Sequence, residues 1–186
     1  MAEIDSLYNK RNGKILIEIS LTSVIQIFNT LDPSPFFEKQ LDDDAERYIV
    51  DTVNDFPKKT EFAIVIHLPK ECSASAECRV IPDAIHNHFR YKAIAEERHL
   101  RQKMLYGRFT LFVALVFLAV SLFVSQAVMQ LGNGLLFYFI SEAFMISGWV
   151  AMWAPVTLFL YELYPILQTK HVYEKISRME IEILPK

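Results

Sequence analysis

Two long apolar stretches, separated by five uncharged residues, constrain the fold of this chain more than any other feature. The stretch 109–129 contains no charged residue, and the stretch 135–161 contains one, Glu142. A helix needs about 20 apolar residues to cross the hydrocarbon core of a bilayer, and it satisfies every backbone polar group there. A soluble fold would have to bury both stretches under roughly one hundred other residues, which are too few. We therefore predict a hairpin of two transmembrane helices.

The charges that flank these stretches predict how the hairpin is oriented. The connection 130–134 carries no charge, whereas basic residues cluster before the first stretch and after the second. By the positive-inside rule, the connection lies outside and both chain ends lie in the cytoplasm. The first 14 residues are polar and lack the apolar core of a secretory signal, so we expect no cleaved export sequence.

Composition excludes some partners and indicates the redox compartment. The net charge is −3, and acidic and basic residues are interspersed, which gives no polybasic surface for nucleic acid. We therefore expect the lipid bilayer, and no nucleic acid, among the partners. The two cysteines, Cys72 and Cys78, are expected to be free thiols in the reducing cytoplasm.

The remaining residues predict a small cytoplasmic α/β domain built from both chain ends. Residues 14–21 alternate between apolar and polar, as in a strand with one buried face, and residues 179–184 do the same. Residues 61–68 are almost continuously apolar, which predicts a central strand covered on both faces and parallel to the first. The predicted organisation is a flexible N-terminus (1–13), an α/β domain (14–107), the transmembrane hairpin (108–162) and a tail that adds a strand (163–186).

Three helix starts are predicted in this domain. Ser23 with Gln26 reads as a capping box for a short helix over 24–31, and Asp43 with Glu46 reads as a second one for a helix over 44–55. The second helix should bury Ala45, Tyr48, Ile49 and Val53. Pro82 is expected to open a third helix, which meets no breaker before Gly107 and can run into the first span.

Glu142 is the main candidate for a functional residue within the hairpin. An ionised carboxylate at that depth costs several kcal/mol, so it must be protonated, paired or in contact with water. In an antiparallel pair, Ser121, Ser125 and Gln126 of the first helix bracket it. One interpretation is a hydrogen bond that joins the helices. The alternative is a proton or cation site in a pore formed by several copies.

Small and aromatic residues on the second stretch suggest close helix packing. Ala143, Ser147, Ala151 and Ala154 follow one side, with Gly148 beside them, and such small residues let another helix approach. On an adjacent face, Trp149 and Trp153 follow Glu142 at helical spacing, and Trp149 is expected to find a protein partner. Pro155 should kink this helix.

The sequence offers little evidence for catalysis or for a cofactor. Cys72, Cys78, His86 and His88 are residue types that bind zinc, but their spacing does not match a standard closed tetrahedral site. Phosphate-binding, dinucleotide-binding and common hydrolase motifs are absent. We predict no cofactor and no metal, and we do not expect an enzyme with a familiar site.

Several motifs together resemble those of a known group of proteins. They are IFNTLDPSPFFEKQLDDDAERYIV, an HLP element, HFRYKA, GWVAMWAP and FLYELYP, which cover most of the chain. In this set the chain resembles an uncharacterised family of small bacterial two-span membrane proteins. The resemblance implies the two-span architecture and a bacterial-type inner membrane, and it implies no activity or catalytic residue.

These observations lead to three hypotheses of function. The first is a homo-oligomeric inner-membrane module whose cytoplasmic domain interacts with itself or with a partner and regulates it. The second is a subunit of an oligomeric ion or proton channel or transporter that uses Glu142 with Ser121, Ser125 or Gln126. The third is a membrane-bound enzyme that uses the histidines and cysteines.

Overall fold

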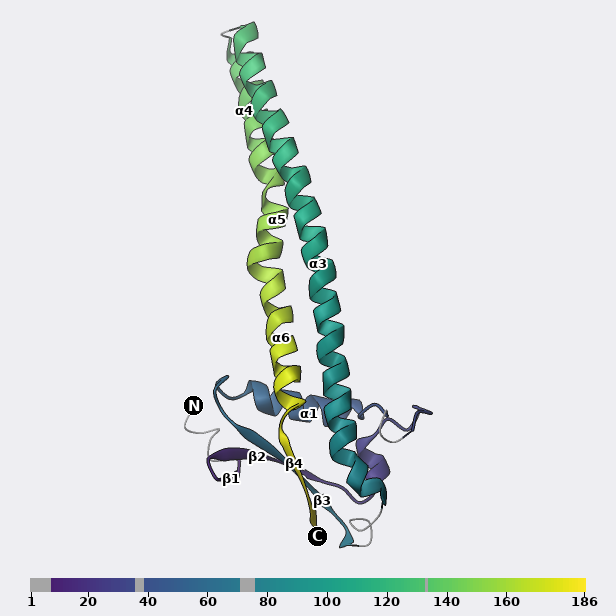
Figure 1. Ribbon diagram of the computed structural model, residues 1–186. Coiled ribbons are helices and arrows are strands. Elements are labelled where there is room, and N and C mark those ends of the chain that lie inside the picture. Colours follow the sequence, from purple (N-terminus) through teal and green to yellow (C-terminus); the bar gives the residue numbers. More distant parts are fainter. Residues whose placement is uncertain (1–7, 36–38, 71–75, 133) are drawn as a thin grey trace. The chain divides into compact units, whose positions relative to one another are not determined.

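A computed structural model describes residues 8–35, 39–70, 76–132 and 134–186. The chain divides into two compact units, one formed by residues up to 95 together with 169–186, and the other by residues 96–168. The helix α3 (Ala76–Leu131) contributes to both units, and so does α6 (Leu163–Ile176). Figure 1 shows the elements with the labels used below.

The first unit contains a four-stranded sheet with the order β1-β2-β3-β4. Its strands are β1 (Lys10–Arg11), β2 (Lys14–Ser20), β3 (Phe62–Leu68) and β4 (Glu180–Pro185). The strand β2 pairs in parallel with β3, which pairs in parallel with β4. The strand β1 forms an antiparallel hairpin with β2 through Asn12 and Gly13, which both have positive φ as a two-residue hairpin turn requires.

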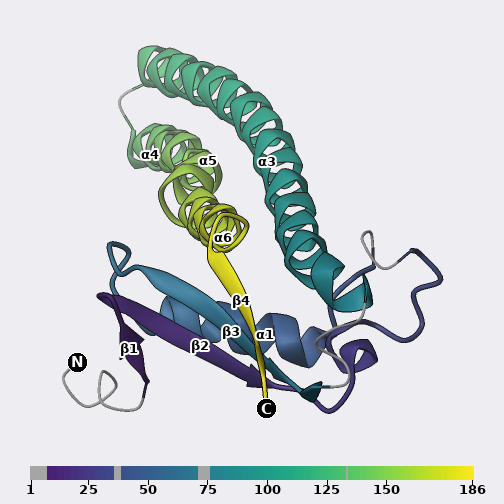
Figure 2. The same cartoon turned by 60° about the horizontal axis from the view of Figure 1, so that its bottom comes forward.

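The sheet confirms three sequence predictions. The strands predicted over 14–21, 61–68 and 179–184 correspond to β2, β3 and β4, within one residue at each end. The parallel pairing of β2 with β3 is also as predicted. Since β4 lies close to the C-terminus, both ends of the chain contribute to one sheet (Figure 2).

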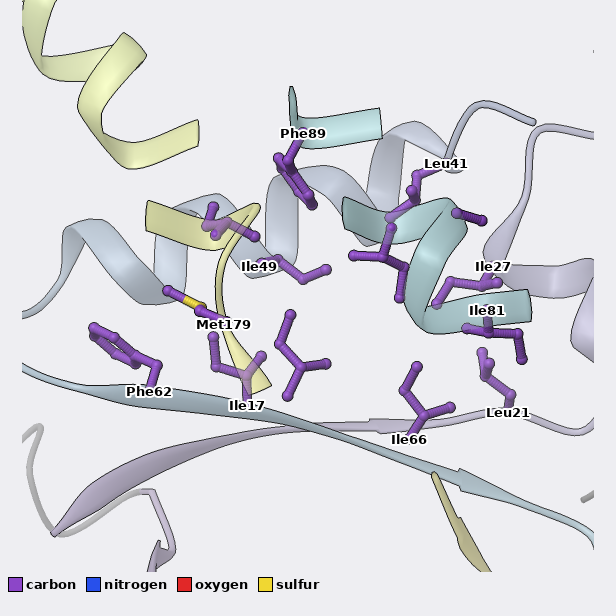
Figure 3. Close-up of a cluster of buried hydrophobic side chains, with 14 of the residues drawn as sticks. Ile17, Leu21, Ile27, Leu41, Ile49, Phe62, Ile66, Ile81, Phe89 and Met179 are labelled. Carbon is purple, nitrogen blue, oxygen red and sulfur yellow. The ribbon is translucent and has the colours of Figure 1, made fainter. Parts of the chain in front are cut away.

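One face of the sheet supports the hydrophobic core. Alternate residues of β2 and β3 pack there against α1 (Asp43–Asn54), the first part of α3 and the end of α6 (Figure 3). Fully buried side chains of this core include Ile17, Ile64, Ile66, Ile49, Ile81, Ile85 and Ile176. Complete burial of such a side chain contributes about 1.5–3 kcal/mol, so this face carries most of the stability of the unit.

The opposite face of β3 is also buried, as expected for a central strand covered on both faces. Ala63 and Val65 are buried on this face, between flanking strands that carry charged side chains. Ion pairs there join Arg11 to Glu182 and, at 2.9 Å, Lys14 to Glu180. Two small apolar residues are thus screened by the stems of longer neighbours.

Two helix starts differ in part from the predictions. Ser23 is the N-cap as predicted, and its side chain accepts from the N–H of Ile25, but the segment that follows is a 3₁₀ turn, η2 (Val24–Ile27), where a helix over 24–31 was expected. The N-cap of α1 is Asp42, whose side chain accepts from the N–H of Asp44, and Glu46 is bonded elsewhere. Tyr48, expected in the core, is 44% exposed, and Thr52 is buried instead.

The third helix also begins earlier than predicted. It starts at Ala76, with Pro82 inside it. Cys78 and Ile81 are buried against the core, and this burial outweighs the hydrogen bond that Pro82 cannot donate. As expected, α3 continues through Gly107 into the first apolar stretch.

The second unit is an antiparallel helix hairpin in which the later part of α3 lies beside α4 (Leu135–Ala151), α5 (Trp153–Thr157) and a π-helical turn, η3 (Leu158–Glu162) (Figure 1). Two helical segments, Cys78–Leu131 and Leu135–Ile176, are long and apolar enough to cross a membrane. Only 17% of the most apolar window of each is buried, unlike the core helices of soluble proteins. Length, composition and exposure thus point to a membrane location.

Candidate functional site

Small and hydroxyl residues form the contact between the two helices of the hairpin. On α3, the buried positions include Ala114, Ser121 and Ser125, and on the returning segment they include Ser141 and Gly148. The hydroxyl oxygens of Ser125 and Ser141 lie 2.7 Å apart and form a buried hydrogen bond. Two of the hydroxyls expected near Glu142 therefore occupy the centre of the hairpin contact, and Ser125 is bonded to a serine.

Gly148 brings the helix backbones close together. A Cβ atom added at this position would lie 3.0 Å from the Cβ of Ser121 and 3.4 Å from the Cα of Leu118. Both atoms are fixed to the opposite helix, so neither can move away without shifting the backbone. Gly148 is thus the member of the predicted packing group that lies within the hairpin contact.

Glu142 is half-buried beside this contact. Within the described part of the chain, its carboxylate has no hydrogen bond or ion pair, and the same holds for the exposed side chain of Gln126. The structure thus does not join Glu142 to the three polar residues that were expected to bracket it. The hydroxyl of Ser147, which lies five residues after Glu142, donates to the backbone oxygen of Ala143 at 2.7 Å.

Most other residues of the predicted packing group are exposed. Ala143, Ser147 and Ala154 are exposed, and Ala151 is half-buried. Trp149 and Trp153 are 61% and 72% exposed, so the expected protein partner of Trp149 is not found among the described residues of this chain. A face with small residues on α4 is therefore left open.

A buried polar cluster lies in the first unit, among helices from both chain ends. The backbone N–H of Leu41 donates to Nδ1 of His88 at 3.2 Å, so Nε2 carries the proton of a neutral imidazole. That Nε2 donates to Glu46 at 2.9 Å, and Lys92 donates to the same carboxylate oxygen at 3.0 Å. The hydroxyl of Tyr173, on α6, donates to the other carboxylate oxygen of Glu46 at 3.5 Å.

The neighbouring donors favour an ionised carboxylate in this cluster. The hydrogen bond from His88 is the largest cause that lowers the pKa of Glu46, and Lys92 adds to it against the opposing effect of burial. Together they lower this pKa from 4.5 to about 2. Because both carboxylate oxygens face protein donors, Glu46 links α1, α3 and α6, and it is poorly placed to act as a general base.

The candidate zinc ligands that the structure describes do not converge. His86 contacts the backbone oxygen of Met179 at 2.8 Å, and His88 belongs to the cluster with Glu46. Cys78 is buried and does not belong to a disulfide, whereas Cys72 lies outside the described residues. No group of three or more potential metal ligands occurs among the residues that were described.

Two sequence signals touch the Glu46 cluster, but neither identifies it. Glu46 lies three residues after an acidic residue and fits a capping box, and His88 fits either a metal ligand or a residue on a partly exposed helix. The two residues are separated by 42 positions, so only the tertiary fold brings them together. Comparison with known proteins found no matching protein family, no matching curated protein and no matching solved structure.

Proposed function

We propose that the protein is an integral inner-membrane module that assembles with copies of itself and regulates a partner through its cytoplasmic α/β domain. The observation that supports this best is the half-buried Glu142 on an apolar helix, without a partner in the described part of the hairpin. A carboxyl group within the hydrocarbon costs several kcal/mol unless it is protonated, paired or hydrated. A contact between copies of the hairpin would supply the missing partner.

The open face of α4 suggests where such a contact forms. Ala143 and Ser147 are exposed next to Glu142 along the chain, and Ala154 is exposed further on. Small side chains allow two helix backbones to approach, and van der Waals contact at short range drives helix association in lipid. Within the hairpin, the close approach uses Gly148, so this other face is available to a second copy.

The first unit supports a regulatory role because both spans lead into it. The helix α3 passes from the α/β unit into the first apolar stretch, and α6 leads from the second stretch to β4. On this proposal both units share these two helices, and the α/β unit with both termini faces the cytoplasm, as the distribution of basic residues favours. Assembly in the membrane would then bring several α/β units together.

The oligomeric state tests this proposal. We expect the purified full-length protein in mild detergent to form a defined oligomer by native mass spectrometry. Ser147→Leu should dissociate it, since it places a bulky side chain on the open face without touching the hairpin contact. Ala119→Leu, which adds the same bulky side chain at an exposed position on α3 away from the hairpin contact, is the matched control. A monomeric wild-type protein, or an equal effect of the two substitutions, would contradict the proposal.

The same observation at Glu142 favours a second candidate, a subunit of an oligomeric proton or cation channel. An unpaired carboxyl group at the interface between copies can bind a proton or a cation. Proton flux into liposomes that contain the protein, abolished by Glu142→Gln but retained in Asp51→Asn, which removes an exposed carboxylate of the first unit, would favour this candidate. A proton flux no greater than that of empty liposomes would exclude the channel.

A further inference from the structure

A groove in the hairpin unit lies between α3 and the bent segment formed by α5 and η3. It has a volume of about 370 Å³, and its lining includes Lys103, Tyr106, Thr110, Trp153, Thr157 and Glu162. Ala154 also lines the groove and is part of the open small-residue face, whereas no lining residue takes part in the Ser125–Ser141 contact. The groove thus adjoins the open face and is distinct from the contact within the hairpin.

Local sequence explains why the groove forms there. The helix α4 ends at Ala151, and Pro155, which has no N–H to donate, follows within the short helix α5. The next five residues adopt the wider π-helical turn η3, a local form that is frequent at functional sites. On the facing helix, Gly107 leaves room for Leu158, whose Cδ2 would lie 2.7 Å from an added Cβ. The two helical segments thus stay in contact at Gly107 and Leu158, and the groove lies beside this contact.

Polarity changes along the groove in the order that a bilayer interface requires. Lys103 and Glu162 form an ion pair of 3.0 Å at one end, with side chains that are 34% and 48% exposed. Tyr106 lies one helical turn further along α3. On the returning helical segment, Trp153 lies about two and a half turns before Glu162. A charged end, a phenol and an indole thus follow one another toward the apolar part of the helix pair.

The position of the charged end matches the headgroup layer. Lys103 precedes the uncharged stretch that begins at 109 by six residues, which is about 9 Å along a helix. The headgroup region extends roughly 5–8 Å beyond each side of the hydrocarbon core. Glu162 directly follows the second apolar stretch, about 1.5 Å beyond its end, so the ion pair that joins it to Lys103 spans the headgroup layer when the apolar stretches occupy the core. Tyrosine is typical of this zone, and Trp153 lies deeper, beside the acyl chains.

We propose that this groove binds a phospholipid with a zwitterionic ethanolamine headgroup. The ammonium of Lys103 and the hydroxyl of Tyr106 contact the phosphate, the carboxylate of Glu162 contacts the amine, and the acyl chain packs along Trp153. A paired acid and base match a headgroup that carries both charges, whereas Glu162 repels a purely anionic headgroup and a quaternary amine cannot donate a hydrogen bond to it. The proposal depends on the membrane placement given under Proposed function, but not on the oligomer.

Tryptophan fluorescence tests the groove directly, because Trp149 and Trp153 are the two tryptophans of the chain. The Trp149→Phe variant is reconstituted in phosphatidylcholine vesicles that contain the same small fraction of brominated phosphatidylethanolamine, brominated phosphatidylcholine or brominated phosphatidylglycerol. We expect brominated phosphatidylethanolamine to quench Trp153 with an association about threefold above the other two, the ratio expected for a screened ion pair. The Trp153→Phe variant, which reports on Trp149, should show no headgroup preference.

Substitutions distinguish a specific site from a general lipid effect. Lys103→Gln should remove the preference at Trp153, whereas Arg101→Gln, an exposed basic residue on the same helix outside the groove lining, should retain it. Equal quenching by the three lipids, a preference for phosphatidylglycerol, or a preference unchanged in Lys103→Gln would overturn the proposal. No quenching of either tryptophan by any brominated lipid would instead refute the membrane placement itself.

Discussion

Replacing Glu46 by Gln should destabilise the α/β unit substantially, because Glu46 is ionised in a buried cluster. Its pKa falls from 4.5 to about 2 in the folded protein, and its side chain is 13% exposed. At about 1.4 kcal/mol per pKa unit, such a change corresponds to roughly 3 kcal/mol, and solvent screening of a group near the surface reduces it to about 2 kcal/mol. Glutamine keeps the shape but loses the charge that His88 and Lys92 stabilise.

The pH dependence of stability gives an independent measure of the same interaction. Because folding lowers the pKa of Glu46, the unfolded chain binds more protons than the folded chain between about pH 4.5 and 2. The stabilisation is therefore complete above pH 4.5 and is lost as the pH falls toward 2. In Glu46→Gln this part of the profile should be flatter than in the wild type.

Hydrogen exchange of the full-length protein in lipid nanodiscs can measure both effects. Loss of about 2 kcal/mol should accelerate exchange of the β3 amides about 30-fold at neutral pH, if these amides exchange through opening of the unit. Asp51→Asn, at an exposed position on the same helix, is the matched control and should change the rates little. An acceleration below threefold in Glu46→Gln, or an unaltered profile between pH 4.5 and 2, would refute this argument.

Two further predictions concern the hairpin. Gly148→Val should lower its thermal stability in detergent, measured by circular dichroism, because the new Cβ meets the Cβ of Ser121 at 3.0 Å, whereas a valine at the exposed Ile146 should be tolerated. Ser125→Ala and Ser141→Ala should each destabilise the hairpin by about 1 kcal/mol, and the double substitution should cost little more than one of them, since both remove the same 2.7 Å hydrogen bond. Additive effects of the two serine substitutions would contradict a direct bond.

The strands could be predicted because their pattern is local. Alternating apolar residues in β2 and β4, and a continuous apolar run in β3, carry the period-two signal without any tertiary information. The cap of α1 could not be predicted in the same way. Three consecutive aspartates can each cap a helix, and Asp42 does so because its backbone is extended, with φ of −63° and ψ of 141°.

Long-range polar contacts limited the prediction further. Glu46 suits a capping box by its sequence position, yet its carboxylate bonds to His88, 42 residues away. A short segment shows the local interactions that a side chain can form, but not the tertiary partners that compete for it. For Glu46, two charge-assisted or buried donors outweigh one exposed backbone N–H.

The choice of helix face in the hairpin shows most clearly what remained undetermined. Two sets of small residues lie on the second span: Ser141 and Gly148, seven positions apart, and Ala143 and Ser147, four positions apart. In lipid the surroundings are as apolar as the side chains, so hydrophobicity does not select between these faces. The hairpin uses the first set, which provides a backbone approach at Gly148 and a hydrogen bond at Ser141. Ala143 and Ser147 are equally small, and both are exposed on the hairpin. We therefore assign this second face to a contact with another copy.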